Sequence, residues 1–93
     1  MGISRRKANH YYEQFKNLSV RIPWRYFVYV LKKYYRFEMY SGGRTSGAQR
    51  VFVNGEIRFT AHEPHSGDEH VDKVSRQNAI RGIEMLEAVN ERS

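Results

Sequence analysis

The histidines are the side chains of this sequence that could move protons near neutral pH. Three of the four stand close together, at positions 62, 65 and 70. An imidazole whose pKa lies near neutrality can act as a general base, a general acid or a metal ligand. Pro64 breaks any helix that would place His62 and His65 on one side, and the sequence has no cysteine to complete a zinc site. We therefore interpret the cluster as solvated loop histidines and expect neither a metal nor a cofactor.

The positive charges are the second feature with chemical consequences. Sixteen Lys and Arg outnumber ten Asp and Glu, which gives a net charge of +6. Residues 1–50 hold eleven of these cations and two acids, whereas residues 51–93 hold five cations and eight acids. Such asymmetry is typical of a surface that faces a polyanion such as RNA. A solvated basic surface without a partner would give the same composition, so both alternatives stay open on charge alone.

Several other signatures are absent from the sequence. It has no glycine loop of the Walker or dinucleotide-binding type and no serine-centred nucleophile elbow. The longest apolar run, from Tyr26 to Leu31, is far shorter than the roughly 20 residues that cross a bilayer. The basic residues near the start are followed by Ala8-Asn9-His10 instead of the apolar part of a signal peptide. We therefore expect no membrane association and a cytoplasmic location.

Apolar residues at helical spacing predict two helices that could position these groups. The first runs from about residue 23 to 35, and its stripe consists of Trp24, Phe27, Val30, Leu31 and Tyr34. The second starts at a cap formed by Asp72 or Ser75. Its buried stripe consists of Ala79, Ile83, Leu86 and Val89. Gly82 lies beside that stripe, where a close approach to a sheet would explain a glycine.

Alternating residues predict three strands, over residues 36–40, 50–53 and 56–60. Asn54-Gly55 is the strongest sequence signal for a two-residue type I′ turn between the last two strands. That turn would pair Val53 with Glu56 and, further along, Gln49 with Thr60. The face expected to pack on the helices carries Phe52, Ile57 and Phe59. The open face carries Gln49, Val51, Arg58, Thr60 and, if the strand continues, His62.

The order of these elements predicts an α+β fold in which helices cover one face of a three-stranded antiparallel sheet. This α-β-β-β-α order is also that of the double-stranded-RNA-binding domain, although a fold alone does not give a function. We divide the chain into a basic N-terminal arm, residues 1–20, and one domain, residues 21–93. Residues 1–7 are expected to be disordered, and residues 8–18 to form an additional short helix.

Four segments within residues 22–88 resemble the HicA toxin family. Residues 47–52, Gly-Ala-Gln-Arg-Val-Phe, look like the family's Gly-Ser-His-x-x-Phe signature. Residues 62–67, His-Glu-Pro-His-Ser-Gly, are similar to a His-x-Pro-His-x-Gly turn found in one branch of the family. Residues 79–86 look like its closing helix, and residues 24–37 fit its opening helix, with Tyr35 where glycine is usual.

The resemblance implies that residues 21–93 form a HicA-like domain. It implies a small endoribonuclease that cleaves messenger RNA without a metal and is neutralised by a HicB-type antitoxin protein. The chemistry would be attack of a ribose 2′-hydroxyl on the adjacent phosphate. Such attack needs a base, an acid and cations that stabilise the developing charge.

The sequence departs from the family at the signature histidine, which aligns with Gln49. Glutamine cannot exchange protons near pH 7 and can only position a phosphate or hydroxyl by hydrogen bonding. Three interpretations stay open: the alignment is shifted, catalysis is weakened or lost while binding remains, or another histidine takes the role. The predicted register places His62 diagonally beyond the Gln49–Thr60 pair, about 7–8 Å from Gln49. Gln49 and His62 are therefore the candidate catalytic positions.

Cations near these positions would bind RNA phosphates. The candidates are Arg44 and Arg50 beside the glycine loop, Arg58 on the open face, and Lys73 and Arg76 at the start of the last helix. The N-terminus of that helix would also attract phosphate. Two further function classes stay open. One is a non-enzymatic RNA-binding module that recognises A-form shape, and the other is a protein–protein adaptor that uses a face containing Tyr26 and Tyr29.

Overall fold

A computed structural model describes residues 5–41, 48–66 and 68–92 of the chain. The elements within these residues are α1 (Arg5–Lys16), α2 (Trp24–Lys33), β1 (Glu38–Ser41), β2 (Gln49–Asn54), β3 (Ile57–His62) and α3 (Lys73–Arg92). The strands form one antiparallel sheet in the order β1-β2-β3. The predicted α+β class and the α-β-β-β-α order, preceded by an additional helix, are confirmed.

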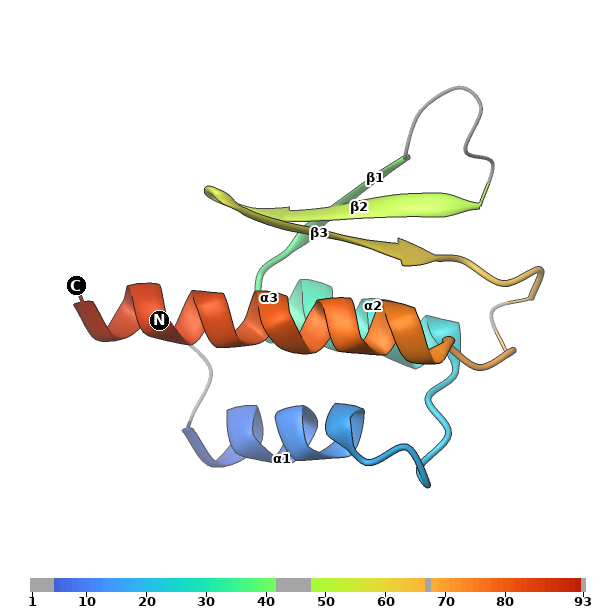
Figure 1. Cartoon of the computed structure of the whole chain (residues 1–93), viewed down its shortest axis with the longest axis horizontal. Coiled ribbons are helices and arrows are strands. Elements are labelled where there is room, and N and C mark those ends of the chain that lie inside the picture. Colours follow the sequence, from blue (N-terminus) through green and yellow to red (C-terminus); the bar gives the residue numbers. More distant parts are fainter. Residues whose placement is uncertain (1–4, 42–47, 67, 93) are drawn as a thin grey trace.

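All three helices lie on one side of the sheet (Figure 1). α2 and α3 pack directly beneath it, and α1 lies on the side of these two helices that faces away from the sheet. The other face of the sheet is not covered by any described element, as predicted for the open face. No helix in the described ranges is both long and apolar enough to cross a membrane.

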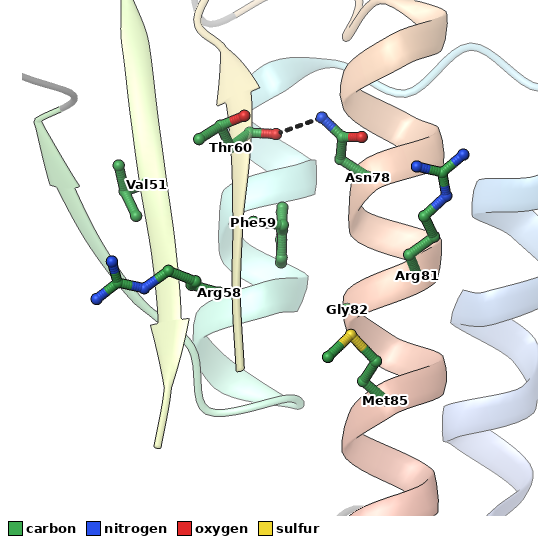
Figure 2. A pocket seen from close by; sticks show the side chains of 8 residues that line it. All are labelled: Val51, Arg58, Phe59, Thr60, Asn78, Arg81, Gly82 and Met85. Atoms are coloured by element: carbon green, nitrogen blue, oxygen red, sulfur yellow. Dashed lines mark hydrogen bonds between the residues drawn. The ribbon is translucent and has the colours of Figure 1, made fainter. Parts of the chain in front are cut away.

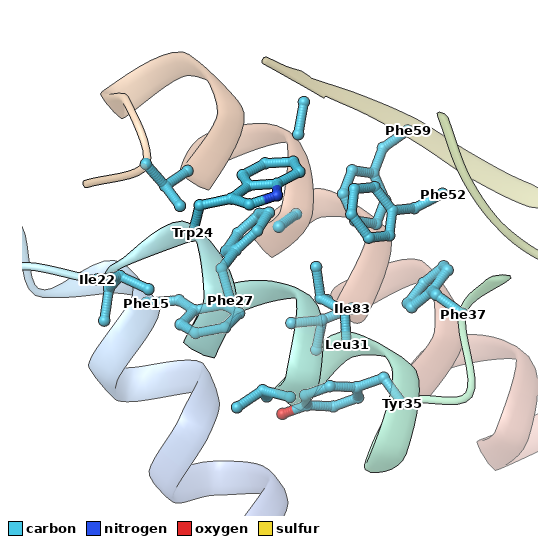
Figure 3. Packing of buried hydrophobic residues seen from close by; sticks show 14 of the residues in the cluster. Phe15, Ile22, Trp24, Phe27, Leu31, Tyr35, Phe37, Phe52, Phe59 and Ile83 are labelled. Carbon is cyan, nitrogen blue, oxygen red and sulfur yellow. The ribbon is translucent and has the colours of Figure 1, made fainter. Parts of the chain in front are cut away.

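Aromatic rings fill the space between the sheet and the helices (Figure 3). Phe52 and Phe59 are cross-strand partners, and their rings stack with centroids 5.0 Å apart. Trp24 and Phe27 of α2 approach the ring of Phe52 edge-on. Burial of each ring contributes roughly 1.5–3 kcal/mol relative to exposure. Because Phe52, Ile57 and Phe59 are all buried, the predicted inner face of the hairpin is confirmed.

The hairpin register differs from the prediction. Asn54 pairs with Ile57, so the two turn residues are Gly55 and Glu56 and not Asn54 and Gly55. Gly55 has a φ of 62° while Glu56 keeps a negative φ, which is the pattern of a type II′ turn, whose first central residue is usually glycine. The pairing therefore moves by two residues, and a shift of two keeps every side chain on its predicted face.

The N-terminal region is part of the folded domain. The prediction of a disordered arm is wrong for residues 5–7, which begin α1, while residues 1–4 lie outside the described residues. Phe15 of α1 is fully buried, and its ring lies 5.3 Å from that of Phe27. The predicted boundary at residue 20 therefore divides a single packed unit.

The last helix packs closely on β3. A Cβ atom added to Gly82 would lie 2.6 Å from the Phe59 ring, which is closer than real side chains approach. The close approach expected at this glycine is thus confirmed. Ala79 and Ile83 are fully buried as predicted, but Val89 is exposed because the last turns of α3 extend beyond the sheet (Figure 1).

Candidate functional site

Gln49 and His62 are direct cross-strand partners at the ends of β2 and β3. Alternation places both side chains on the open face, since Phe52 and Phe59 point to the helices. Cβ atoms of direct partners are typically about 4.5–5.5 Å apart, closer than diagonal neighbours. The corrected register therefore brings the two candidate catalytic positions nearer to each other than predicted. His62 is exposed and Gln49 is half-buried.

The start of α3 holds His62 in place. The backbone N–H of His62 donates a hydrogen bond to Ser75 Oγ at 2.8 Å. The N–H of Ser75 donates in turn to Asp72 Oδ1 at 2.7 Å, so Asp72, one of the two predicted caps, is the N-cap of α3. Ser75 is buried and joins the helix to the strand. This positioning role of Ser75 could not be recognised from the sequence, which indicates only that the residue suits a helix start.

A hollow of about 260 Å³ adjoins the Gln49–His62 pair. Its walls are formed by Gln49, Thr60, Ala61, His62, Asp72, Val74, Ser75 and Asn78. An imidazole, an amide and a carboxylate therefore border one small space beside the open face. The carboxylate of Asp72 already occupies the N-terminus of α3, so the predicted attraction of phosphate to that helix end is offset by a fixed negative charge.

The Arg50 side chain, on the helix side of the sheet, supports the Gln49–His62 pair through hydrogen bonds. Its Nε donates to Glu63 Oε1 at 3.0 Å, and its Nη1 donates to the carbonyl oxygen of Gln49 at 3.0 Å. The N–H of Glu63 also donates to the carbonyl oxygen of Ala48 at 2.7 Å. Arg50 thus ties the start of β2 to the segment after β3. Because Glu63 neutralises part of its charge, Arg50 is better suited to hold Gln49 in place than to bind RNA.

The remaining candidate cations are dispersed. Arg58 is exposed on the open face, four residues before His62 and therefore about 13 Å from it along the strand. Lys73 is exposed at the first position of α3. Arg44 lies outside the described residues. At that spacing Arg58 suits a phosphate next to the one at His62.

Arg76 is not an RNA-binding residue, contrary to the prediction. Only 4% of its surface is exposed, and burial lowers the pKa of its guanidinium. Its nitrogens donate to the backbone carbonyl oxygens of Gln14, Phe15, Asn17 and Val20 at 2.8–3.1 Å. These oxygens belong to the end of α1 and the turn that follows. Arg76 therefore fastens α1 to α3 and presents no charge to a ligand.

Tyr40 is an open-face residue that the sequence analysis did not single out. It pairs with Val51, and its ring is about half exposed. Its hydroxyl donates to the carboxylate of Glu38, and this hydrogen bond raises the pKa of Tyr40. Alternation within residues 36–40 was the signal that could have identified it. An exposed ring on a sheet is the usual platform on which a nucleic acid base stacks.

The face proposed for an adaptor is largely closed. The hydroxyl of Tyr26 donates to Gln14 Oε1 at 2.7 Å, and its ring packs against Tyr11 of α1. Tyr29 is exposed; its ring meets that of Tyr34 edge-on, with centroids 6.0 Å apart, and its hydroxyl accepts a hydrogen bond from Lys33. Tyr26 and Tyr29 therefore do not form one exposed aromatic surface.

Metal ligands do not gather at any point of the described chain: no group of three or more His, Cys, Asp or Glu is close enough to hold an ion. His65 and His70 are both exposed, in agreement with their interpretation as solvated loop residues.

Comparisons with protein-family models, curated proteins and solved structures find no match for the chain. The function must therefore be argued from the geometry and from the sequence resemblance.

Proposed function

We propose that the protein is a HicA-type endoribonuclease with a double-stranded-RNA-binding-domain-like fold, and that its chemistry is slowed by Gln49. The observation that carries the proposal is the direct pairing of Gln49 with His62 on the open face. The signature position and the nearest imidazole then border one hollow, with backbone contacts that hold both in place. RNA would lie across the open face, with a base on Tyr40 and a phosphate near Arg58.

In this proposal His62 is the general base. Its neutral imidazole accepts the proton of the ribose 2′-hydroxyl, and the 2′-oxygen attacks the adjacent phosphorus. The bond between phosphorus and the 5′-oxygen breaks, which leaves a 2′,3′-cyclic phosphate and a 5′-hydroxyl whose proton comes from water. The Gln49 amide donates a hydrogen bond to a non-bridging phosphate oxygen. A positioned base raises the rate about 10²–10⁴-fold. Because His62 acts as a base and no side chain acts as the general acid, cleavage is slow.

The same proposal names the partners. The substrate is messenger RNA, and the inhibitor is a HicB-type antitoxin that covers the site in the cytoplasm. A non-enzymatic RNA-binding module is the second candidate, and the presence of glutamine at position 49 favours it. Tyr40, Arg58 and Lys73 would serve binding in either case, because none of them has to exchange a proton.

A cleavage time course on an unstructured RNA in the presence of a chelator tests the proposal. We expect slow cleavage with cyclic phosphate ends and unchanged rates when the chelator is added. RNA binding without any cleavage would favour the binding module. If the protein neither binds nor cleaves RNA at low salt, both candidates are excluded.

A further inference from the structure

β3 has one edge that the sheet leaves unpaired, because it is the last strand in the order β1-β2-β3. Asn54 and Ile57 close the hairpin as a hydrogen-bonded pair, so the backbone groups of Arg58, Thr60 and His62 point away from β2. Two contacts with α3 agree with this assignment. The N–H of His62 donates to Ser75 Oγ at 2.8 Å, and Asn78 Nδ2 donates to the Thr60 carbonyl oxygen at 3.0 Å.

The side chains of α3 therefore close one end of this edge and leave the other end open. The open groups are the N–H of Thr60 and both the N–H and the carbonyl of Arg58. The described part of the chain provides none of the three with a hydrogen-bond partner. An unpaired row of this kind is a ready template for another strand.

A hollow of about 360 Å³ runs beside these groups, between β3 and α3 (Figure 2). Thr60 and Asn78 border the closed end, and Gly82 of α3 comes close to Phe59 at its base. The helix side also presents Met85, a large apolar side chain that is about half exposed. The hollow thus offers backbone hydrogen bonds on one side and apolar surface on the other.

The charge around this hollow is positive. Arg58 lines it from the strand side and Arg81 from the helix side, and the two side chains extend in opposite directions in Figure 2. Both are exposed, and neither forms an ion pair with any described residue. No acidic side chain is among the residues that line the hollow. The two unneutralised guanidinium groups therefore flank the hollow, one on its strand side and one on its helix side.

We propose that the β3–α3 groove binds an extended acidic segment of a partner protein, which adds to the sheet as a fourth strand. One residue of the added strand would bond both backbone groups of Arg58, and a neighbouring carbonyl would accept from the Thr60 N–H. Alternate side chains of that strand point to opposite faces, so acidic groups would meet Arg58 while apolar groups face Met85. Main-chain bonds give affinity and side-chain pockets give specificity in this binding mode.

The backbone groups favour a peptide over RNA. A phosphate group only accepts hydrogen bonds, so it would leave the Arg58 carbonyl without a donor, whereas a peptide residue supplies a donor and an acceptor together. A second copy of this chain is disfavoured because its own β3 edge would bring Arg58 and Arg81 toward identical cations. The groove shares Arg58 with the proposed RNA surface and shares Thr60 and Asn78 with the hollow beside His62. The inference uses the unpaired backbone edge of β3 and does not rest on the ribonuclease proposal.

Nuclear magnetic resonance of the isotope-labelled full chain, titrated with short capped peptides, tests this inference. The probe alternates glutamate and valine, and two control peptides carry either lysine for glutamate or N-methyl groups on the glutamates, whose N–H groups would face the β3 edge. We expect the probe to shift the amide signals of Arg58, Thr60 and Met85. The lysine peptide should lose the attraction to the arginines, and the N-methyl peptide should lose the strand hydrogen bonds.

Two variants sharpen the test on the protein side. Arg81→Gln should lower the affinity for the probe about two- to fivefold, as expected for the loss of one exposed ion pair. Lys32→Gln, which removes an equal charge from the exposed side of α2, should leave the affinity unchanged. Thr60→Pro removes an N–H that points away from β2. It should therefore lower the affinity for the probe and leave the pairing of β2 with β3 intact.

Several results would overturn the inference. No shifts at millimolar probe, equal binding of the N-methyl peptide, or shifts confined to Tyr40 and Gln49 would each do so. The same would follow if a short RNA produced the Arg58 and Thr60 shifts and the probe did not. A concentration-dependent dimer that masks these two amides would identify a second copy as the occupant and exclude the partner peptide.

Discussion

The guanidinium of Arg76 donates two hydrogen bonds to the carbonyl oxygen of Phe15, one from Nε at 3.1 Å and one from Nη2 at 2.8 Å. The acceptor belongs to the last turn of α1, where backbone carbonyls have no partner within their own helix. The same side chain also reaches carbonyls beyond the helix end. One buried cation thus takes the place of a local cap and binds two distant parts of the chain together.

We predict that Arg76→Met lowers the free energy of unfolding by at least about 2 kcal/mol, because buried carbonyls left without a donor cost about 1–3 kcal/mol each. Urea denaturation measures the loss. Arg81→Met is the matched control, since Arg81 is exposed five residues further along the same helix; its effect should stay within about 0.5 kcal/mol. Equal stability of the two variants would show that the Arg76 contacts do not hold α1.

A histidine at position 49 should restore the missing acid–base group. We predict that Gln49→His raises the rate of RNA cleavage by about 10²–10⁴-fold. The position is half-buried on the open face, so the free energy of unfolding should change by less than about 1 kcal/mol. Rates measured for wild type, Gln49→His and Gln49→Ala on one unstructured RNA check this. A variant no faster than an active wild type would mean that position 49 does not take part in the chemistry.

His62→Ala should abolish cleavage while the affinity for RNA stays within a few fold. The imidazole is exposed, and the backbone N–H that bonds Ser75 remains in the variant, so the fold should persist. His65→Ala is the control, because His65 is an exposed histidine of the following loop. Gel-based cleavage and filter binding, run side by side, separate the two effects. Full cleavage by a folded His62→Ala protein would remove His62 from the mechanism.

RNA affinity should fall steeply with salt if the open face binds phosphates. Each phosphate neutralised on a single strand contributes a slope of about 0.7 in a plot of log affinity against log salt. Arg58→Gln should reduce the slope by about that amount, whereas Lys32→Gln, in α2 on the helix side of the sheet, should not change it. Filter binding at several salt concentrations gives both slopes. Identical slopes for the Arg58 variant and wild type would place the RNA elsewhere.

The contact between Tyr12 and Glu84 should stabilise the folded protein near neutral pH and lose this effect in strong alkali. The hydrogen bond to the Glu84 carboxylate raises the pKa of Tyr12 from 10 to about 12. The folded phenol therefore holds its proton where the unfolded phenol loses it. This contribution is complete below pH 10 and disappears as the pH rises to about 12.

Ultraviolet titration of the phenolate, with urea unfolding at several alkaline pH values, measures this effect. Tyr12→Phe should flatten the loss of stability between pH 10 and 12 relative to wild type. The free energies of the two proteins should converge at the alkaline end of the range. The prediction fails if their difference stays constant with pH.

The sequence was sufficient for the faces of the sheet but not for its register. Alternation identifies the inner face from Phe52, Ile57 and Phe59, and a register shift of two residues keeps these side chains on that face. Gly55, however, can serve either as the second residue of a type I′ turn or as the first of a type II′ turn. Only packing of Phe52 on Phe59 selects the second alternative. The direct pairing of Gln49 with His62 could therefore not be predicted from a local signal.

The binding partners of the buried arginine in α3 could not be identified from the sequence either. Helical spacing places Arg76 beside the stripe of Ala79 and Ile83 and places Arg81 on the polar side, but it does not show what Arg76 contacts. Arg76 is buried because its donors meet carbonyls of a segment 56–62 residues earlier in the chain. No local pattern encodes such a distant partner. The same limit applies to Ser75, whose importance comes from the N–H of His62.

The position of α3 along the chain has a consequence for folding during synthesis. Every other described element precedes it, yet Arg76 is what holds the end of α1, and Ala79, Gly82 and Ile83 cover the inner side of the sheet. A nascent chain that has emerged only through β3 would expose Phe59 and leave the α1 carbonyls without their donor. Such late, long-range contacts are slow to form. The packing of α1 and of the inner face of the sheet is therefore completed only when α3 joins them.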